Sequence, residues 1–235
     1  MHPVLFKSAH FTLYSYGLCV ALAMTLAWVL AAWFARRFSY SATEATDLLF
    51  VVFVTGIAGA RLFYAFQHPE EYAGRWQAVF FLQEGGLVWY GGFLLAVACT
   101  MALAGLRRMP VLAWADFFSP ILAVSHGVGR IGCFLNGCCL GKNGHPVQLY
   151  ETALSVALSF FLFARFSRRK KEGEIFGLYL VGYGCLRFTL EFLRADQRIV
   201  SGLTIPQWIS LALAGAGLFI LSPLFRSHVR DRVER

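Results

Sequence analysis

The chain has 235 residues, of which 58% are hydrophobic and only 14% are charged, and its mean hydropathy is +0.59. Soluble domains carry about 25% charged residues, so this composition excludes an ordinary soluble protein and indicates a membrane protein. The net charge of +8 does not indicate nucleic-acid binding, because the basic residues flank apolar runs and form no patch on a soluble domain.

Seven apolar segments approach the roughly 20 residues that a membrane-spanning helix needs. Period-2 alternation is absent, so we expect helices and no barrel strands. The predicted fold is an all-α polytopic membrane protein in which residues 1–235 form a single integral-membrane domain. The first apolar run lacks a preceding basic segment and a following A-x-A cleavage site, so we expect it to remain as a helix. The predicted helices are 13–34, 47–66, 87–106, 111–135, 149–166, 175–193 and 205–224.

The basic residues predict the orientation of the chain in the membrane. Thirteen of the 21 fall on one side, after the first, third and fifth helices and in the tail, and only Lys7, Arg75, Lys142 and Arg198 fall on the other. The positive-inside rule then places the N-terminus outside and the C-terminus in the cytoplasm, as an odd number of spans requires. The segment 67–86 lies between the second and third helices, and we expect its short apolar run, 78–82, at the interface.

Four arginines, Arg61, Arg130, Arg187 and Arg194, lie inside or at the ends of apolar segments. An arginine near a helix centre costs roughly 2.5–3.5 kcal/mol on insertion scales, so a buried partner or an anionic ligand has to offset that cost. In the predicted topology all four lie in the outer half of the membrane, at the depth of phospholipid headgroups. Snorkelling to the interface is the alternative, and it weighs most for Arg194.

The sixth predicted helix carries Arg187, Glu191 and Arg194 on one face, because they are four and three residues apart. An internal ion pair that lets the helix tolerate its own charges would explain two of them. In the second interpretation, the carboxylate holds a guanidinium group whose N–H donors face a phosphate. This interpretation explains why two cations accompany one anion.

Glycines recur through the stretch from Ser125 to Gly141, which reads SHGVGRIGCFLNGCCLG. They permit close backbone approach or a broken helix end. The match of 127–132 to the dinucleotide pattern G-x-G-x-x-G is rejected, because no strand precedes it. Cys133, Cys138 and Cys139 do not have a zinc spacing, so no metal site is expected and small packing residues are favoured. A disulfide or a reactive thiol stays open.

Further polar and aromatic residues lie at the same predicted outer interface. They include Tyr16 in the first helix, Tyr90 in the third, and Gln148, Tyr150 and Glu151 at the start of the fifth. For the aromatic residues alone, an interfacial belt would be a sufficient explanation.

Taken in order, these motifs resemble the prolipoprotein diacylglyceryl transferase family over most of the chain. The most specific are Gly129-Arg-Ile-Gly-Cys-Phe-Leu-Asn-Gly137 and the run from Gly182 to Arg194, GYGCLRFTLEFLR. Weaker or shorter matches are Tyr16-Gly-Leu18, Gly59-Ala-Arg61, Gly85-Gly86, Gly91-Gly92 and His145-Pro-Val-Gln-Leu-Tyr-Glu151.

The resemblance implies transfer of a diacylglyceryl group from phosphatidylglycerol to the lipobox cysteine of preprolipoprotein signal peptides. It implies a multi-pass protein of the bacterial inner membrane that needs no cofactor. Arg130 and Arg187 would bind and stabilise the phosphate, and Glu191 would position Arg187. Arg61 and Arg194 are further candidates for binding the headgroup. Asn136 and Gly141 would shape the site, and Tyr16, Gln148, Glu151 and Tyr183 would line it.

The sequence departs from the family pattern at several positions. Tyr90 stands where the family commonly has the histidine of H-G-G-L, Cys133 and Cys138 replace an asparagine and a glutamate, and the outer loop before His145 is short. The catalytic base therefore stays open between Tyr90, Glu151 and activation of the thiol by a positive field alone.

Three other functions remain as alternatives. A small-molecule transporter or channel also carries intramembrane charges, but here they lie at one leaflet and no inverted repeat is visible. An enzyme that uses the same lipid with another acceptor, or an inactive homologue that only binds lipid, would keep the arginines and change the chemistry.

Overall fold

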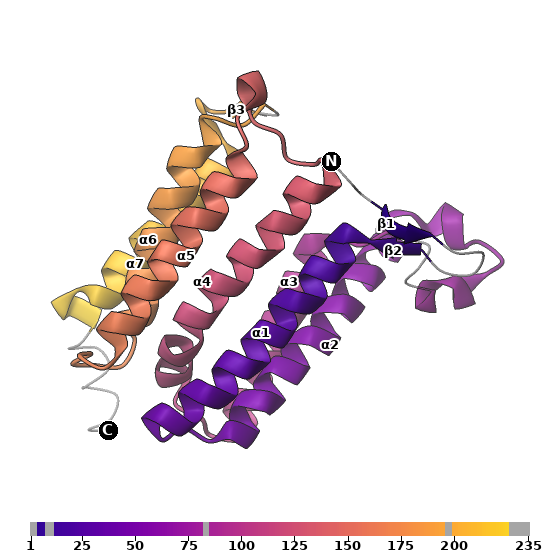
Figure 1. Ribbon diagram of the computed structural model, residues 1–235. Coiled ribbons are helices and arrows are strands. Elements are labelled where there is room, and N and C mark those ends of the chain that lie inside the picture. Colours follow the sequence, from indigo (N-terminus) through magenta and orange to yellow (C-terminus); the bar gives the residue numbers. More distant parts are fainter. Residues whose placement is uncertain (1–3, 8–11, 82–84, 196–198, 226–235) are drawn as a thin grey trace. The chain divides into compact units, whose positions relative to one another are not determined.

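The computed structural model describes residues 4–7, 12–81, 85–195 and 199–225. Within these residues the protein is built mainly from seven α-helices (Figure 1). They are α1 (Ser15–Phe38), α2 (Ala42–Gln67), α3 (Trp89–Leu106), α4 (Val111–Asn136), α5 (Val147–Phe166), α6 (Glu174–Glu191) and α7 (Ile205–Leu221). Residues 1–30 and 112–235 form one compact unit and residues 31–111 form a second, so α1 runs from the first unit into the second.

Five of the described helices, α1 to α5, are long and apolar enough to cross a membrane, and the protein is accordingly a polytopic membrane protein. The remaining helices, α6 and α7, differ from these five in composition or in length. Helix α6 contains the charged residues Glu174, Arg187 and Glu191, whereas α7 is apolar but has only 17 residues. The count of seven spans and the single membrane domain stay predictions.

Each predicted helix segment overlaps one observed helix, and only the ends differ by a few residues. The largest difference is at the start of α2, where the Ser41 side chain accepts a hydrogen bond from the Glu44 backbone N–H and begins the helix before its apolar run. Several residues used in the sequence argument lie outside the described part of the chain. These are the N-terminal residues 1–3 and 8–10, Leu82, Arg198, Arg226, Arg230, Arg232 and Arg235.

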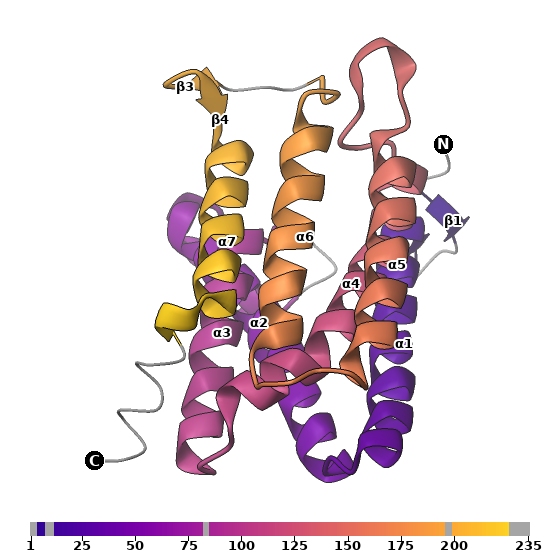
Figure 2. The same cartoon turned by 90° about the vertical axis from the view of Figure 1, so that its left-hand side faces the viewer.

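In the first unit, α6 packs against both α5 and α7 (Figure 2). Glycines allow α6 and α7 to approach closely, since a Cβ atom at Gly184 would lie 2.7 Å from the Ser210 carbonyl oxygen and one at Gly217 would lie 2.6 Å from the Gly177 carbonyl oxygen. In lipid such contacts are a main source of helix association, because apolar side chains gain little by leaving lipid tails.

Helices α4 and α5 are joined by side-chain hydrogen bonds to the backbone. The Ser159 hydroxyl donates to the Pro120 carbonyl oxygen at 2.7 Å, and the Thr152 hydroxyl donates to the Gly127 carbonyl oxygen at 3.0 Å. These bonds fix the register of the two helices that carry Arg130 and Glu151.

One end of this unit is organised by the fully buried carboxylate of Asp116 on α4. It accepts hydrogen bonds of 2.8 Å from the backbone N–H groups of Gly173 and Phe176, and Arg169 lies 3.7 Å away. These N–H groups belong to the start of α6, where an anion is favourable. Glu174, which pairs with Arg165 at 2.6 Å, adds a second ion pair near this end.

The opposite end carries the loop after α4 and a short hairpin that leads into α7 (Figure 2). The hairpin consists of β3 (Ile199–Val200) and β4 (Leu203–Thr204), joined through Ser201 and Gly202, which both have positive φ. A second antiparallel hairpin, β1 (Val4–Lys7) and β2 (Thr12–Tyr14), precedes α1.

The second unit is centred on the pair α2 and α3, which lie side by side (Figure 1). Their backbones touch at Gly59 and Gly91, where an added Cβ on Gly59 would lie 2.5 Å from the Gly91 carbonyl oxygen. Between them the chain forms the short 3-10 helices η1 (Pro69–Tyr72) and η2 (Trp76–Phe80), which are too short to span, in agreement with the expectation for this segment.

The close contact of α2 with α3 yields a matched test of stability. Gly59→Ala should destabilise the protein by about 1–3 kcal/mol, because the new methyl group meets the α3 backbone. Gly56→Ala, three residues earlier on the same helix, has nothing within 4 Å and should have no destabilising effect. Thermal unfolding of both purified variants in detergent measures the difference. Equal melting temperatures would contradict the observed packing.

Candidate functional site

Five charged residues of the first unit gather where α4, α5 and α6 approach the loop after α4. Arg130 on α4 pairs with Glu151 on α5, with Nη2 2.8 Å from Oε2. The second oxygen of this carboxylate, Oε1, lies 2.9 Å from Nε2 of His126. The carboxylate side chain is only 1% exposed and the Arg130 side chain 13%, so the pair is shielded from solvent.

A similar arrangement is present at the end of α6. Arg187 Nη2 lies 2.8 Å from Glu191 Oε2, as the four-residue spacing predicted, and Arg194 Nε lies 3.9 Å from the same oxygen. The Thr204 hydroxyl donates to Glu191 Oε1 at 3.1 Å while also accepting from the Gln207 backbone N–H at 3.3 Å. Glu191 therefore orients both arginines and is itself held by the first turn of α7.

The two groups belong to one site. Glu151 interacts electrostatically with Arg187 as well as with Arg130, and Tyr183 interacts with all three residues. The Tyr183 ring packs edge-on against His126, with their centroids 5.2 Å apart. We call the set Arg130, Glu151, Arg187, Glu191 and Arg194 the arginine cluster.

Some N–H donors of the arginine cluster have no hydrogen-bond partner in the described part of the protein. Arg130 Nε and Arg187 Nη1 are buried and make no hydrogen bond to any residue that the structure describes. An unsatisfied buried donor is costly, and buried polar groups in folded proteins almost always have partners. The arrangement is typical of a site that binds an anion.

The loop after α4 is fastened to α5 and to the end of α6 beside the arginine cluster. The Gln148 side chain is 1% exposed and donates to the Cys138 carbonyl oxygen at 2.6 Å. Gly141 pairs with Arg194 in a β-bridge, and a Cβ atom there would lie 2.3 Å from the His145 carbonyl oxygen, so only glycine fits. The Lys142 N–H donates to the Leu193 carbonyl oxygen at 2.7 Å and fastens the loop to the end of α6.

Two other predicted residues lie at this end of the first unit. Tyr16 is in the first turn of α1, where its ring lies close to Gly132 of α4, and it is 46% exposed. Asn136 is the last residue of α4 and is exposed.

Three cysteines also gather beside Arg130. Its Nη1 donates to Cys133 Sγ at 3.6 Å and to Cys139 Sγ at 3.9 Å. The pKa of the Cys139 thiol is lowered to about 4, chiefly by a hydrogen bond with the Cys133 thiol and further by the charges of Arg130 and Arg194. The spacing of these cysteines did not predict that their sulfur atoms come together.

Arg61 and Tyr90 belong to the second unit. Arg61 is 3% exposed and donates to the carbonyl oxygens of Ala78 (2.8 Å), Val79 (2.9 Å), Phe81 (3.0 Å), Gly86 (3.2 Å) and Gly85. These bonds engage every nitrogen of the guanidinium group, which has five N–H donors. This favours a structural role for Arg61, which holds the segment between α2 and α3, over phosphate binding.

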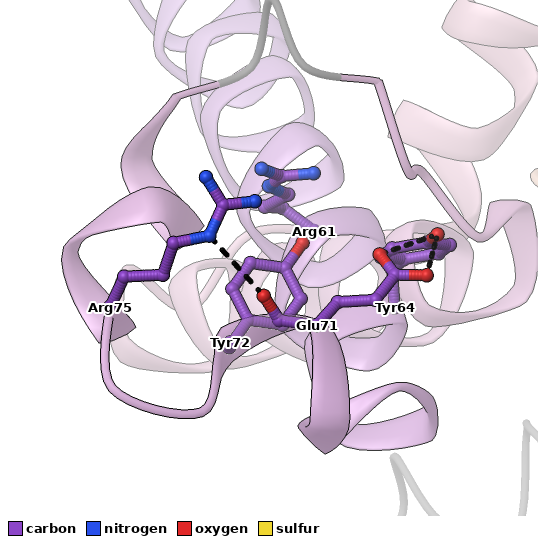
Figure 3. Close-up of a pocket in the computed structure, with 5 residues that line it drawn as sticks. All are labelled: Arg61, Tyr64, Glu71, Tyr72 and Arg75. Atoms are coloured by element: carbon purple, nitrogen blue, oxygen red, sulfur yellow. Dashed lines mark hydrogen bonds between the residues drawn. The ribbon is translucent and has the colours of Figure 1, made fainter.

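A small polar pocket of about 110 Å³ lies beside Arg61 and is lined also by Tyr64, Glu71, Tyr72 and Arg75 (Figure 3). Its members are engaged with one another. The Tyr64 hydroxyl donates to the Glu71 carboxylate at 3.0 Å, Arg75 Nε donates to the Glu71 carbonyl oxygen at 3.4 Å, and the Arg61 guanidinium lies 5.4 Å from the Tyr72 ring centroid. Tyr90, in the first turn of α3, is 54% exposed.

Two residues beside the arginine cluster, His126 and Thr204, were not predicted from the sequence. His126 is four residues before Arg130 on the same helix face, a spacing that could have found it. Thr204 begins a T-x-x-Q capping box just before an apolar run. Its contact with Glu191 depends on the turn between α6 and α7 and has no local signature.

Comparison with known proteins gives one consistent result. A family model for prolipoprotein diacylglyceryl transferase matches residues 3–222. Proteins named phosphatidylglycerol–prolipoprotein diacylglyceryl transferase are similar over most of their length. The one from Clostridium tetani is 30% identical over 94% of this chain and 97% of its own. The one from Bordetella bronchiseptica is 28% identical over 94% and 95%, and that from Methylobacillus flagellatus is 34% identical over 74% and 76%. The chain therefore belongs to the prolipoprotein diacylglyceryl transferase family.

Proposed function

We propose that this protein is a transferase that moves the diacylglyceryl group of phosphatidylglycerol to the lipobox cysteine of preprolipoproteins. The product is a thioether, and glycerol phosphate is released. The observation that carries the proposal is the pair of buried donors, Arg130 Nε and Arg187 Nη1, without a partner among the described residues. The names of the relatives supply the substrate class.

The charge balance of this reaction explains why an arginine cluster is useful. The cysteine thiol loses its proton, and the thiolate sulfur attacks the glycerol carbon of the lipid as the bond from that carbon to the phosphate oxygen breaks. A phosphodiester with one negative charge becomes a phosphate monoester with about two at neutral pH. Fixed guanidinium donors therefore stabilise the transition state more than the bound lipid.

Each member of the arginine cluster has a role in this mechanism. Arg130 and Arg187 bind the phosphate through donors that their carboxylate partners leave available. Glu151 and Glu191 hold the guanidinium groups in place, and Arg194 adds positive charge beside Glu191. The remaining residues would line or shape the cavity: Tyr16, Tyr183, Gln148, Asn136 and Gly141.

His126 is the group best placed to accept the thiol proton. Glu151 is engaged by both Arg130 and His126, so it is better suited to orienting its partners than to acting as the base. An imidazole that is oriented by a buried carboxylate is a common general base. The His126 side chain is 34% exposed, which leaves it accessible to a substrate. Tyr90, at the position of the family histidine, is the alternative acceptor.

The same proposal includes the setting of the protein. It has seven spans in the bacterial inner membrane, with its N-terminus outside and its C-terminus in the cytoplasm. The distribution of basic residues supports this orientation. The arginine cluster then lies at the outer leaflet, at the depth of anionic lipid headgroups, while Asp116 and Arg169 lie at the cytoplasmic end of the same helices.

Removing either phosphate-binding arginine should abolish transfer. We expect Arg130→Ala and Arg187→Ala each to lower the rate by about 100-fold or more, because each removes charge-stabilising donors. The assay contains purified protein, phosphatidylglycerol and a lipobox peptide, and mass spectrometry detects the thioether. Arg107→Ala removes an exposed arginine that pairs with Asp47 and should keep full activity. Full activity of both site variants would refute the proposed role, and lipid binding by the wild-type protein without product would indicate an inactive homologue.

A second pair of variants distinguishes the two candidate bases. His126→Gln can keep a hydrogen bond to Glu151 but cannot accept the proton, so kcat should fall by about 100-fold or more while KM for the lipid changes little. Tyr90→Phe removes the hydroxyl group alone and should leave kcat within a few-fold. The opposite result, a large loss in Tyr90→Phe and none in His126→Gln, would assign the proton transfer to Tyr90.

A further inference from the structure

Three thiols meet at the end of α4. The sulfur atoms of Cys133, Cys138 and Cys139 all lie within 4.8 Å of one another, and all three cysteines are free. Cys133 is in the last turn of the helix and the other two are in the loop that follows. Gly137 and Cys139 both have positive φ, 77° and 62°, and this reversal of the chain brings the loop thiols back toward Cys133. We call these three residues the thiol cluster.

The distances in the thiol cluster suit a single thiophilic ion. Zinc–sulfur bonds are about 2.3 Å long, so three sulfurs around one such ion are about 3.8–4.0 Å apart. Sulfurs that already lie within 4.8 Å of one another need to move by less than about 1 Å to reach that geometry. Thiolate ligands select soft cations such as Zn(II) and Cu(I) over hard cations.

The surroundings of the thiol cluster offset its charge and hold its shape. Three thiolates carry one more negative charge than a zinc ion can neutralise and two more than a Cu(I) ion can. Arg130 Nη1 is already within 3.6 Å of Cys133 Sγ and 3.9 Å of Cys139 Sγ, so a compensating cation is in place. The Cys138 carbonyl accepts from Gln148, a partner outside the ligand set that fixes the loop.

A role in packing explains only part of the cluster. Cys133 is buried, as expected for a small hydrophobic residue, but Cys138 and Cys139 are only partly buried. A residue other than glycine in the left-handed region, as Cys139 is, costs roughly 1–2 kcal/mol. A packing role therefore explains neither the partial exposure of Cys138 and Cys139 nor the backbone strain at Cys139. A disulfide would use only two of the three thiols.

We propose that Cys133, Cys138 and Cys139 form a three-thiolate binding site for one soft metal ion, either Zn(II) or Cu(I). The site goes beyond the proposed transfer reaction and shares Arg130 with it, because Arg130 contacts two of the three sulfurs.

Metal titration of the full-length protein tests the site. The purified protein is reduced, freed of metal and titrated without oxygen, in one arm with Zn(II) and in the other with Cu(I), each in competition with a chromophoric chelator. We expect one ion per chain in at least one arm, and the two arms distinguish the ions. Cys139→Ser should weaken this binding by about 100-fold or more. Cys99→Ser and Cys185→Ser, which change cysteines outside the cluster, should bind as the wild type does.

Thiol protection gives a second readout that does not depend on a variant remaining folded. Wild-type protein with and without the ion is alkylated, and the modified cysteines are located by mass spectrometry of peptides. Bound metal should protect all three cluster thiols and leave Cys185 as reactive as before. The proposal is overturned if neither ion binds at one per chain, if Cys139→Ser binds as tightly as the wild type, or if the cluster thiols are not protected.

Discussion

Two buried carboxylates, Glu151 and Glu191, hold the arginines around which the first unit is organised. An isolated charge in such surroundings is costly, and its removal from water is offset only by close, well-oriented partners. Glu151 is engaged by Arg130 and His126, and Glu191 by Arg187 and Arg194. Three guanidinium groups thus share two carboxylates, which leaves the cluster with a net positive charge.

Small residues and buried polar contacts position these charges. In lipid, helices gain little from burying apolar side chains, so close backbone contacts and hydrogen bonds decide how they associate. Helix α6, which supplies Arg187 and Glu191, is held against α7 through glycine contacts and is capped at its other end by Asp116. The hydroxyls of Ser159 and Thr152 set the register of α4 and α5 and thereby the distance between Arg130 and Glu151.

Local patterns predicted the helices and one ion pair of the arginine cluster, but they could not predict the long-range contacts. Apolar runs located all seven helices, and the spacing of Arg187 and Glu191 predicted their ion pair. The pairing of His126 with Glu151 joins residues 25 positions apart and depends on helix register. The five carbonyl groups that accept hydrogen bonds from Arg61 and the close approach of three cysteines depend on loop conformation. Positive-φ residues such as Cys139 determine that conformation.

The contact between Thr204 and Glu191 links α7 to the arginine cluster, and the apolar sequence of α7 did not indicate this link. A single hydroxyl closes the cap of α7 and also fastens the carboxylate that orients Arg187. The turn from β4 into α7 is therefore part of the support of the arginine cluster. For protein engineering, insertions or epitope tags at 199–204 would disturb the arginine cluster, whereas a fusion joined beyond Leu221 would leave this linkage intact.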